Sequence, residues 1–251
     1  MSIRSYTREQ IIAGIDKYTR QADNRVRILF AGRHIREFNF DAMCKLYANI
    51  KGEHYDDVII IEAFPGDHPR LLPMVSEPVF VTPLGEVAVN DALRNDFCDE
   101  DDDFYIDDAG FSDDMAIHEH LMMLQCTLDN FRVLSIQIVH AQSSIVRELA
   151  NAIAELMRDR NALIIFCADA SGSSPEQLKK LKDYINGKSF SRIKNYLNTG
   201  DAGITDSAPI SSGSLTAAEW ELETHLYIPA PGEPVCLSGY AQLRSRSNPA
   251  P

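Results

Sequence analysis

Cysteine pairs, long apolar runs and basic patches are all scarce in this sequence of 251 residues. The 5 cysteines are an odd number and none has C-x-x-C spacing. This argues against a zinc ribbon or a disulfide framework and predicts reduced, mostly buried thiols. No apolar run approaches the roughly 18 residues that cross a bilayer, and no apolar signal core follows the residues from Met1 to Tyr6. We therefore expect a cytoplasmic protein that does not have a membrane as a partner.

Basic side chains are outnumbered, with 24 Lys and Arg against 37 Asp and Glu and a formal net charge of −13. Such a field repels a phosphate backbone unless the basic residues are strongly segregated. The two basic groups, at residues 25–36 and 179–182, are not interleaved with aromatic residues, so nucleic acid is not an expected partner. The acidic run from Asp99 to Asp103 lacks the order of an EF-hand calcium loop and is predicted to be a solvated loop.

The sequence does contain the composition of an ordinary globular protein, with 45% hydrophobic and 24% charged residues. Thr7-Arg8-Glu9-Gln10 predicts a capped helix start, as does Ser174 before Pro175. Val58-Ile59-Ile60-Ile61 is the clearest buried strand, because four β-branched residues in a row are typical of a sheet that is covered on both faces. Further strands are expected near residues 26–30, 78–82, 131–139, 162–168 and 235–243, and further helices near residues 43–50, 113–128, 143–157 and around Trp220.

This alternation predicts an α/β fold, a three-layer sandwich with a central, mostly parallel sheet and helices on both faces. No convincing linker divides the chain. We therefore expect a single domain over residues 1–243, followed by a flexible tail over residues 244–251.

Five segments, in order, resemble the Memo-like family of the class III extradiol dioxygenase superfamily. They are Thr82-Pro83-Leu84-Gly85-Glu86, the helix start at residues 113–121, the strand at residues 131–139, Phe166-Cys167-Ala168-Asp169, and Leu237-Ser238-Gly239-Tyr240-Ala241-Gln242. The resemblance implies a non-haem metal in a cleft at the strand ends. Its ligands are a His from an early P-H-A-G-Y turn, a His from a G-P-S-H-H turn, and a late Cys.

The residues at these positions differ from that pattern. Phe30 replaces the first His, and Ala202 falls near the late Cys. The second turn aligns with Pro65 and Gly66, or with Asp67 and His68 if a gap of two residues is allowed. Phe, Ala and Gly side chains offer no lone pair to a cation. The resemblance therefore implies a family member without the metal site, and no cofactor is expected.

Polar residues remain near the implied cleft and form the candidate pocket: Asp169, His120, Arg33, His34 and His68. Asp169 ends a strand, where ligands bind in open α/β sheets, and His120 matches a His of the family. A buried carboxylate that has lost a metal needs another positive charge. We therefore expect Arg33 or His120 to lie beside Asp169, in a cleft suited to a small polar or anionic ligand.

Three functional hypotheses follow, and fold alone cannot choose between them. The first is a non-catalytic binding or partner subunit with a residual polar pocket for a small polar ligand or a protein partner. The second is an enzyme with changed chemistry on a small polar substrate. It would use either acid–base catalysis by Asp169 and His120, or non-haem iron or another transition metal at a relocated site formed by His34, His68 and His120. The third is a structural member of a complex, whose acidic face recruits a basic partner.

Overall fold

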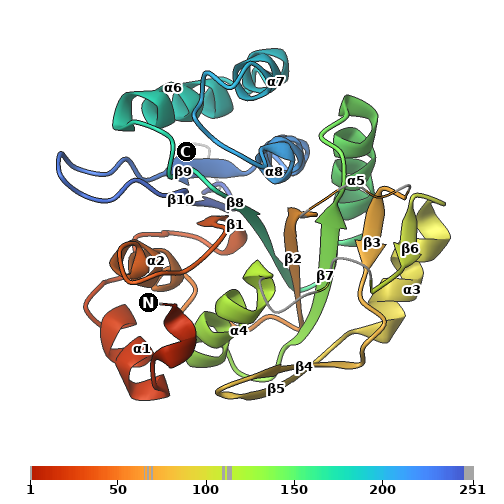
Figure 1. Ribbon diagram of the computed structural model, residues 1–251, viewed down its shortest axis with the longest axis horizontal. Coiled ribbons are helices and arrows are strands. Elements are labelled where there is room, and N and C mark those ends of the chain that lie inside the picture. The colour runs from red at the N-terminus through yellow and green to blue at the C-terminus, as the bar shows by residue number, and fades with distance from the viewer. Residues whose placement is uncertain are drawn as a thin grey trace, which may run out of the picture.

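An eight-stranded sheet forms the centre of the computed structural model, which describes residues 2–64, 66, 68, 70–108, 111 and 115–245. The strand order is β6-β3-β7-β2-β8-β1-β10-β9 (Figure 1). The strands are β1 (Val26–Gly32), β2 (Asp57–Ala63), β3 (Leu72–Met74), β6 (Phe104–Ile106), β7 (Arg132–Ile138), β8 (Ala162–Ala168), β9 (Glu223–Leu226) and β10 (Ser238–Gln242). The central strands β7, β2, β8 and β1 pair in parallel, whereas β3 and β10 pair antiparallel with their inner neighbours. The predicted α/β fold with a mostly parallel sheet is confirmed.

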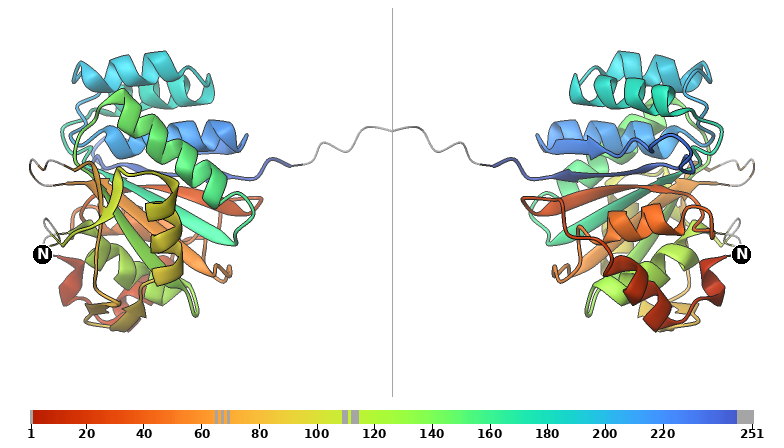
Figure 2. Two further views of the ribbon diagram at one scale, coloured as in Figure 1. Left: turned by 90° about the vertical axis from the view of Figure 1, so that its right-hand side faces the viewer. Right: turned by 90° about the vertical axis from the view of Figure 1, so that its left-hand side faces the viewer.

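Helices cover both faces of the sheet, as expected for a three-layer sandwich (Figures 1 and 2). One face carries the α4 layer, which consists of α1 (Arg8–Ile15), α2 (Phe40–Tyr47) and α4 (Ala116–Thr127). The other carries the α8 layer, which consists of α3 (Asp91–Glu100), α5 (Ser143–Leu156), α6 (Pro175–Asn186), α7 (Phe190–Asn198) and α8 (Ala208–Glu219). Both predicted caps are confirmed, since Thr7 and Ser174 each form a capping box with the glutamine three residues later.

Side chains of the central strands alternate between two buried cores, because successive residues of a strand point to opposite faces. In β1, Ile28 and Phe30 belong to the core under the α8 layer, whereas Leu29 and Ala31 belong to the core under the α4 layer. Both faces are buried, which is why these strands are mostly apolar. The same alternation decides on which side of the sheet a polar residue at a strand end emerges.

Some elements differ from the prediction. The strand expected at residues 78–82 is β4 (Val79–Thr82), which pairs with β5 (Gly85–Ala88) in a separate two-stranded sheet. The acidic run is not simply a loop: Asp99 and Glu100 belong to α3. Asn90 caps this helix at the Leu93 N–H, and Leu93 and Phe97 bury one of its faces. The short helix expected around Trp220 is α8, which ends just before that residue.

Most of the tail expected at residues 244–251, namely residues 246–251, lies outside the described residues, as do Asp113 and Asp114 at the expected start of α4. None of the helices in the described part of the chain is long and apolar enough to cross a membrane.

Candidate functional site

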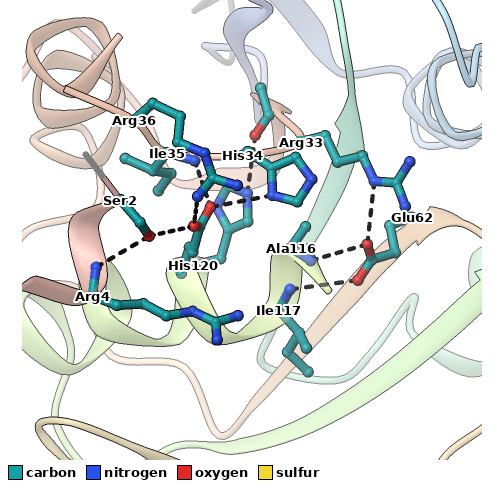
Figure 3. A network of polar contacts seen from close by, with 12 residues as sticks. Ser2, Arg4, Arg33, His34, Ile35, Arg36, Glu62, Ala116, Ile117 and His120 are labelled. Atoms are coloured by element: carbon teal, nitrogen blue, oxygen red, sulfur yellow. Dashed lines mark hydrogen bonds and ion pairs between the residues drawn. The ribbon is translucent and has the colours of Figure 1, made fainter. Parts of the chain in front are cut away.

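The carboxyl ends of β1, β2 and β8 meet the N-terminus of α4 at one end of the sheet. Arg33 and His34 follow β1, Glu62 lies near the end of β2, and Asp169 follows β8. In open α/β sheets, ligands bind outside the carboxyl ends of the strands. Figure 3 shows the polar contacts that surround this position.

Glu62 places a fully buried carboxylate at the N-terminus of α4. Its oxygens accept hydrogen bonds from the N–H groups of Ala116 at 3.0 Å and Ile117 at 3.4 Å, where the helix dipole favours a negative charge (Figure 3). Arg33 Nε lies 3.6 Å from Glu62 Oε2, and Arg33 Nη1 lies 2.7 Å from Asp206 Oδ2. Burial raises the pKa of Glu62, and the Ala116 N–H and Arg33 offset part of that rise.

Glu119, on α4, is a second buried carboxylate and connects the segment after β1 to the N-terminal residues. It accepts hydrogen bonds from the Ser2 hydroxyl at 2.6 Å and the Ile35 N–H at 2.7 Å, and it pairs with Arg36. His34 Nδ1 lies 3.4 Å from Glu119 Oε2, the same oxygen that accepts the hydrogen bond from Ile35. Burial alone raises the pKa of Glu119, but the contacts with His34, Ser2, Ile35 and Arg36 together outweigh burial and lower it to about 2. An ionised Glu119 therefore orients His34 and Arg36.

His120 is fully buried between α2 and β1. Its Nε2 lies 3.1 Å from the Gly32 carbonyl oxygen, and its Nδ1 lies 2.7 Å from the Tyr47 hydroxyl. A carbonyl can only accept, so Nε2 carries the proton and Nδ1 accepts from Tyr47. Burial lowers the pKa of His120 to about 4. The side chain is therefore a neutral, satisfied core histidine and not a pocket residue.

A cavity of about 330 Å³ lies beside these contacts and is lined by Arg33, His34, Arg36, Asp169 and Phe38, among others. Asp169 accepts a hydrogen bond from the Ser171 N–H at 2.8 Å. The cavity therefore brings together three basic side chains from one short segment after β1 and one half-exposed carboxylate after β8. We call it the β1 pocket.

The charge pair expected between Asp169 and Arg33 or His120 is not formed. Within the described ranges, the Asp169 carboxylate has no ion pair, Arg33 pairs with Glu62 and Asp206, and His120 contacts Tyr47 and Gly32. The expectation was wrong because the carboxylate that most needs a counter-charge is that of Glu62 and not that of Asp169. Glu62 is fully buried, whereas half-exposed Asp169 is reached by water.

The three histidines of the hypothetical relocated metal site do not converge. His34 faces Glu119, His120 is enclosed in the core, and His68 stacks on Tyr105 with ring centroids 5.8 Å apart. In the part of the chain that the structure describes, the only three His, Cys, Asp or Glu side chains with ligand atoms within 4.8 Å of one another are Asp101, Asp103 and Glu148. The geometry contradicts a metal site at His34, His68 and His120, and it also leaves His68 outside the β1 pocket.

The acidic group of Asp101, Asp103 and Glu148 belongs to the α3–β6 connection and α5, close to the β6 edge of the sheet. Burial raises the pKa of Glu148 to about 7, with further contributions from the charges of Asp103 and Asp101. The group is separate from the strand ends that form the β1 pocket.

Phe30 and Ala202, at two positions of the implied metal ligands, lie in the core under the α8 layer. The Phe30 ring stacks on Phe166 with centroids 6.1 Å apart. A Cβ added at Gly213 of α8 would lie 2.7 Å from the Phe30 ring and 2.6 Å from the Phe166 ring. Helix backbone therefore fills the space beside Phe30. Pro65 and Asp67, at the second ligand position, lie outside the described residues.

Sequence reasoning missed the two buried carboxylates. Glu62 comes directly after the run of β-branched residues that predicts β2, so its position at a strand end was a usable signal. Glu119 lies between two histidines on an otherwise apolar helix, and its interior position becomes evident only when Ser2, Arg36 and α4 are brought together.

Comparison with known proteins gives a family and a fold. A family model described as Memo-like protein matches residues 17–205. The crystal structure of the uncharacterized protein JW3007 from Escherichia coli K12 aligns with a TM-score of 0.60, covers 86% of this chain and 99% of its own, and is 12% identical in sequence. Identity this low shows likeness of fold alone. No curated protein matches this chain.

Proposed function

We propose that this chain, which belongs to the Memo-like protein family, is a binding protein that holds a small polar or anionic ligand in the β1 pocket without using a metal ion. The observation that carries the proposal is the gathering of Arg33, His34 and Arg36 around one cavity at the carboxyl end of β1. In a chain with a formal net charge of −13, such a group is unusual and suits a ligand that brings negative charge.

The basic side chains of the β1 pocket are held in place before a ligand arrives. Glu119 contacts both His34 and Arg36, and Glu62 and Asp206 contact Arg33. Side chains that are already ordered lose little further rotamer entropy on binding. Guanidinium groups also offer several parallel donors to a carboxylate or phosphate. The buried carboxylates thus support a binding role for the pocket.

At two of the three implied ligand positions, the residues do not fit a metal ion. The side chains of Phe30 and Ala202 have no donor atom, and both are packed in the core under the α8 layer. The acid–base alternative has less support than binding, because both ring nitrogens of His120 are occupied by Tyr47 and the Gly32 carbonyl. A partner-subunit role is compatible with ligand binding and forms part of the same proposal.

The test is anion binding by the purified protein, measured by calorimetry and thermal shift with phosphate, sulfate and acetate. Wild-type protein is expected to bind at least one of them, and Arg36→Gln is expected to weaken that binding by roughly tenfold, the loss of one charge-assisted contact. Arg158→Gln is the matched control, because Arg158 is exposed and pairs with Glu219 on α8. Each melting temperature is compared with that of the same variant without ligand.

Elemental analysis of the same preparation tests the metal-free part of the proposal. About one equivalent of iron, copper or zinc, retained without added metal, would contradict it. Equal binding by wild-type protein and Arg36→Gln would remove the β1 pocket as the binding site.

A further inference from the structure

We propose that the ligand of the β1 pocket is an elongated organic acid, whose apolar body extends over Phe38 into a second, neighbouring cavity and ends there in a hydrogen-bonding group. This inference rests on the proposed function, because the acid group occupies the β1 pocket. It adds the chemical class of the ligand and its orientation.

The second cavity, of about 180 Å³, adjoins the β1 pocket, since Phe38 and Cys236 line both. We call it the Tyr227 pocket. Its walls come from the turn after α1, from α2 and from the segment between β9 and β10, and they include Tyr18, Tyr227, Pro229 and Pro234. Two adjoining cavities that share a wall can hold a single ligand longer than either.

The shared wall is apolar and open to a ligand. Phe38 is 54% exposed, and only Val81 is more exposed among the large hydrophobic side chains in the described part of the chain. Burying an exposed aromatic ring against an apolar ligand is favourable in proportion to the area removed from water. An exposed Phe between two cavities therefore favours a ligand whose middle portion is apolar.

The Tyr227 pocket also offers a specific polar contact. Ser238, at the start of β10, is 5% exposed and lines this pocket. Its hydroxyl has no hydrogen-bond partner among the described residues. Buried hydroxyl groups normally have a partner, and leaving one unsatisfied costs free energy. A ligand hydroxyl that reaches Ser238 Oγ would satisfy it.

Charges fix the direction of the ligand. Asp41 and Glu233 line the Tyr227 pocket, and the only basic side chain among its described lining residues, Lys45, lies over the Tyr227 ring at 4.7 Å. An anionic group in this pocket would meet two carboxylates. The β1 pocket has three basic side chains, Arg33, His34 and Arg36, against one carboxylate, that of Asp169. The acid group therefore belongs in the β1 pocket, and the neutral hydrogen-bonding end belongs beside Ser238.

The test compares three carboxylates by calorimetry: acetate, phenylpropionate and para-hydroxyphenylpropionate. Phenylpropionate is expected to bind at least roughly tenfold more tightly than acetate, because its ring covers Phe38. The added hydroxyl is expected to improve affinity by a further few-fold, the usual net value of a hydrogen bond. Phe38→Ser should remove the gain from the ring, and Ser238→Ala should remove only the gain from the hydroxyl. Val81→Ser, at an exposed position of β4, is the control and should leave all three affinities unchanged.

The outcomes separate the two proposals. If acetate or phosphate binds in an Arg36-dependent manner but phenylpropionate binds no more tightly, the further inference fails and the proposed function stands. If none of these anions binds, both fail. If phenylpropionate binds tightly but neither Phe38→Ser nor Ser238→Ala changes its affinity, the proposed orientation of the ligand is wrong.

Discussion

Two buried glutamates on the α4 side of the sheet set the electrostatics of the candidate site. Glu62 and Glu119 come from different elements, yet each contacts a basic residue of the segment after β1. An isolated carboxylate in a protein interior is costly unless it is paired and hydrogen-bonded. The basic side chains of the β1 pocket therefore act in two ways, because they compensate buried negative charge and also line a cavity.

Glu119 gives the first prediction, which concerns pH. Its pKa is about 2 in the folded protein, against an ordinary value of 4.5. A carboxylate whose pKa is lower in the folded protein than in the unfolded chain adds stability at pH values above its unfolded-state pKa. This stability is lost as the pH falls towards the folded-state pKa. This pKa difference corresponds to about 3 kcal/mol of folding stability at neutral pH. Glu119→Gln should therefore lower the melting temperature at pH 7 by roughly 6 °C or more.

This loss should shrink as the pH falls from 4.5 towards 2, because wild-type Glu119 then becomes protonated as well. Thermal melts over that range are the measurement, with Glu86→Gln at an exposed position of β5 as the control. A difference between wild-type and Glu119→Gln that stays constant with pH would show that the carboxylate charge is not the cause.

The sequence could place residues at the site but could not pair them. Arg33, His34 and Asp169 directly follow apolar runs that predict β1 and β8, so their position at strand ends was readable. Which base meets which acid depends on contacts across more than 80 positions, as between Arg36 and Glu119. No local pattern carries that information.

At the scale of elements, α8 was predicted only in part, because a short helix was expected around Trp220 and the observed helix spans Ala208–Glu219. Its sequence, Ala-Pro-Ile-Ser-Ser-Gly-Ser-Leu-Thr-Ala-Ala-Glu, is buried on nearly every side and has no polar face. A helix is predicted from an amphipathic pattern that repeats every 3.6 residues. A helix that is enclosed by other elements does not require such a pattern. By contrast, α5 and α6 each show one apolar stripe, and both were expected near their observed positions.

Gly213 provides a prediction at this scale. Replacing a helical glycine with alanine ordinarily stabilises a helix by about 1 kcal/mol. Here the new Cβ would lie 2.6 Å from the Phe166 ring and 2.7 Å from the Phe30 ring, so the rings or the helix must move. Gly213→Ala should therefore destabilise the protein by about 1–3 kcal/mol, measured by urea unfolding.

A double-mutant cycle supplies the control. The Phe30→Leu change shortens one of the two opposing side chains, so Gly213→Ala should cost less in the Phe30→Leu background than in wild-type protein. An equal cost in both backgrounds would mean that Phe30 does not limit the space beside α8.

At the scale of the whole molecule, two cores share one sheet. Each central strand contributes side chains to both, as Ile28 and Leu29 do in β1. If one core lost its order, the same strands would also expose the side chains that they contribute to the other core. The sequence indicated this arrangement through uninterrupted apolar strands such as Val58 to Ile61, which is why the central sheet was foreseeable although the β4–β5 hairpin was not.

The shared sheet predicts a single unfolding transition. Calorimetric and van't Hoff enthalpies should agree. Leu181→Ala under the α8 layer and Met43→Ala under the α4 layer should each shift the whole transition, by about 2–5 kcal/mol. Two resolved transitions, each sensitive to only one of these substitutions, would instead indicate two separately folding units and would contradict the single domain expected over residues 1–243.

The bond between His120 and the Gly32 carbonyl has a spectroscopic consequence. A ring N–H that is fully buried and hydrogen-bonded exchanges slowly with water, so it should give a separate downfield proton resonance. With the pKa of His120 lowered to about 4, that resonance should stay fixed between pH 5 and 8. A His120 signal that titrates near pH 6.5 would show that α4 and β1 separate enough to admit water. The same signal offers a direct way to observe whether a ligand in the β1 pocket tightens this junction.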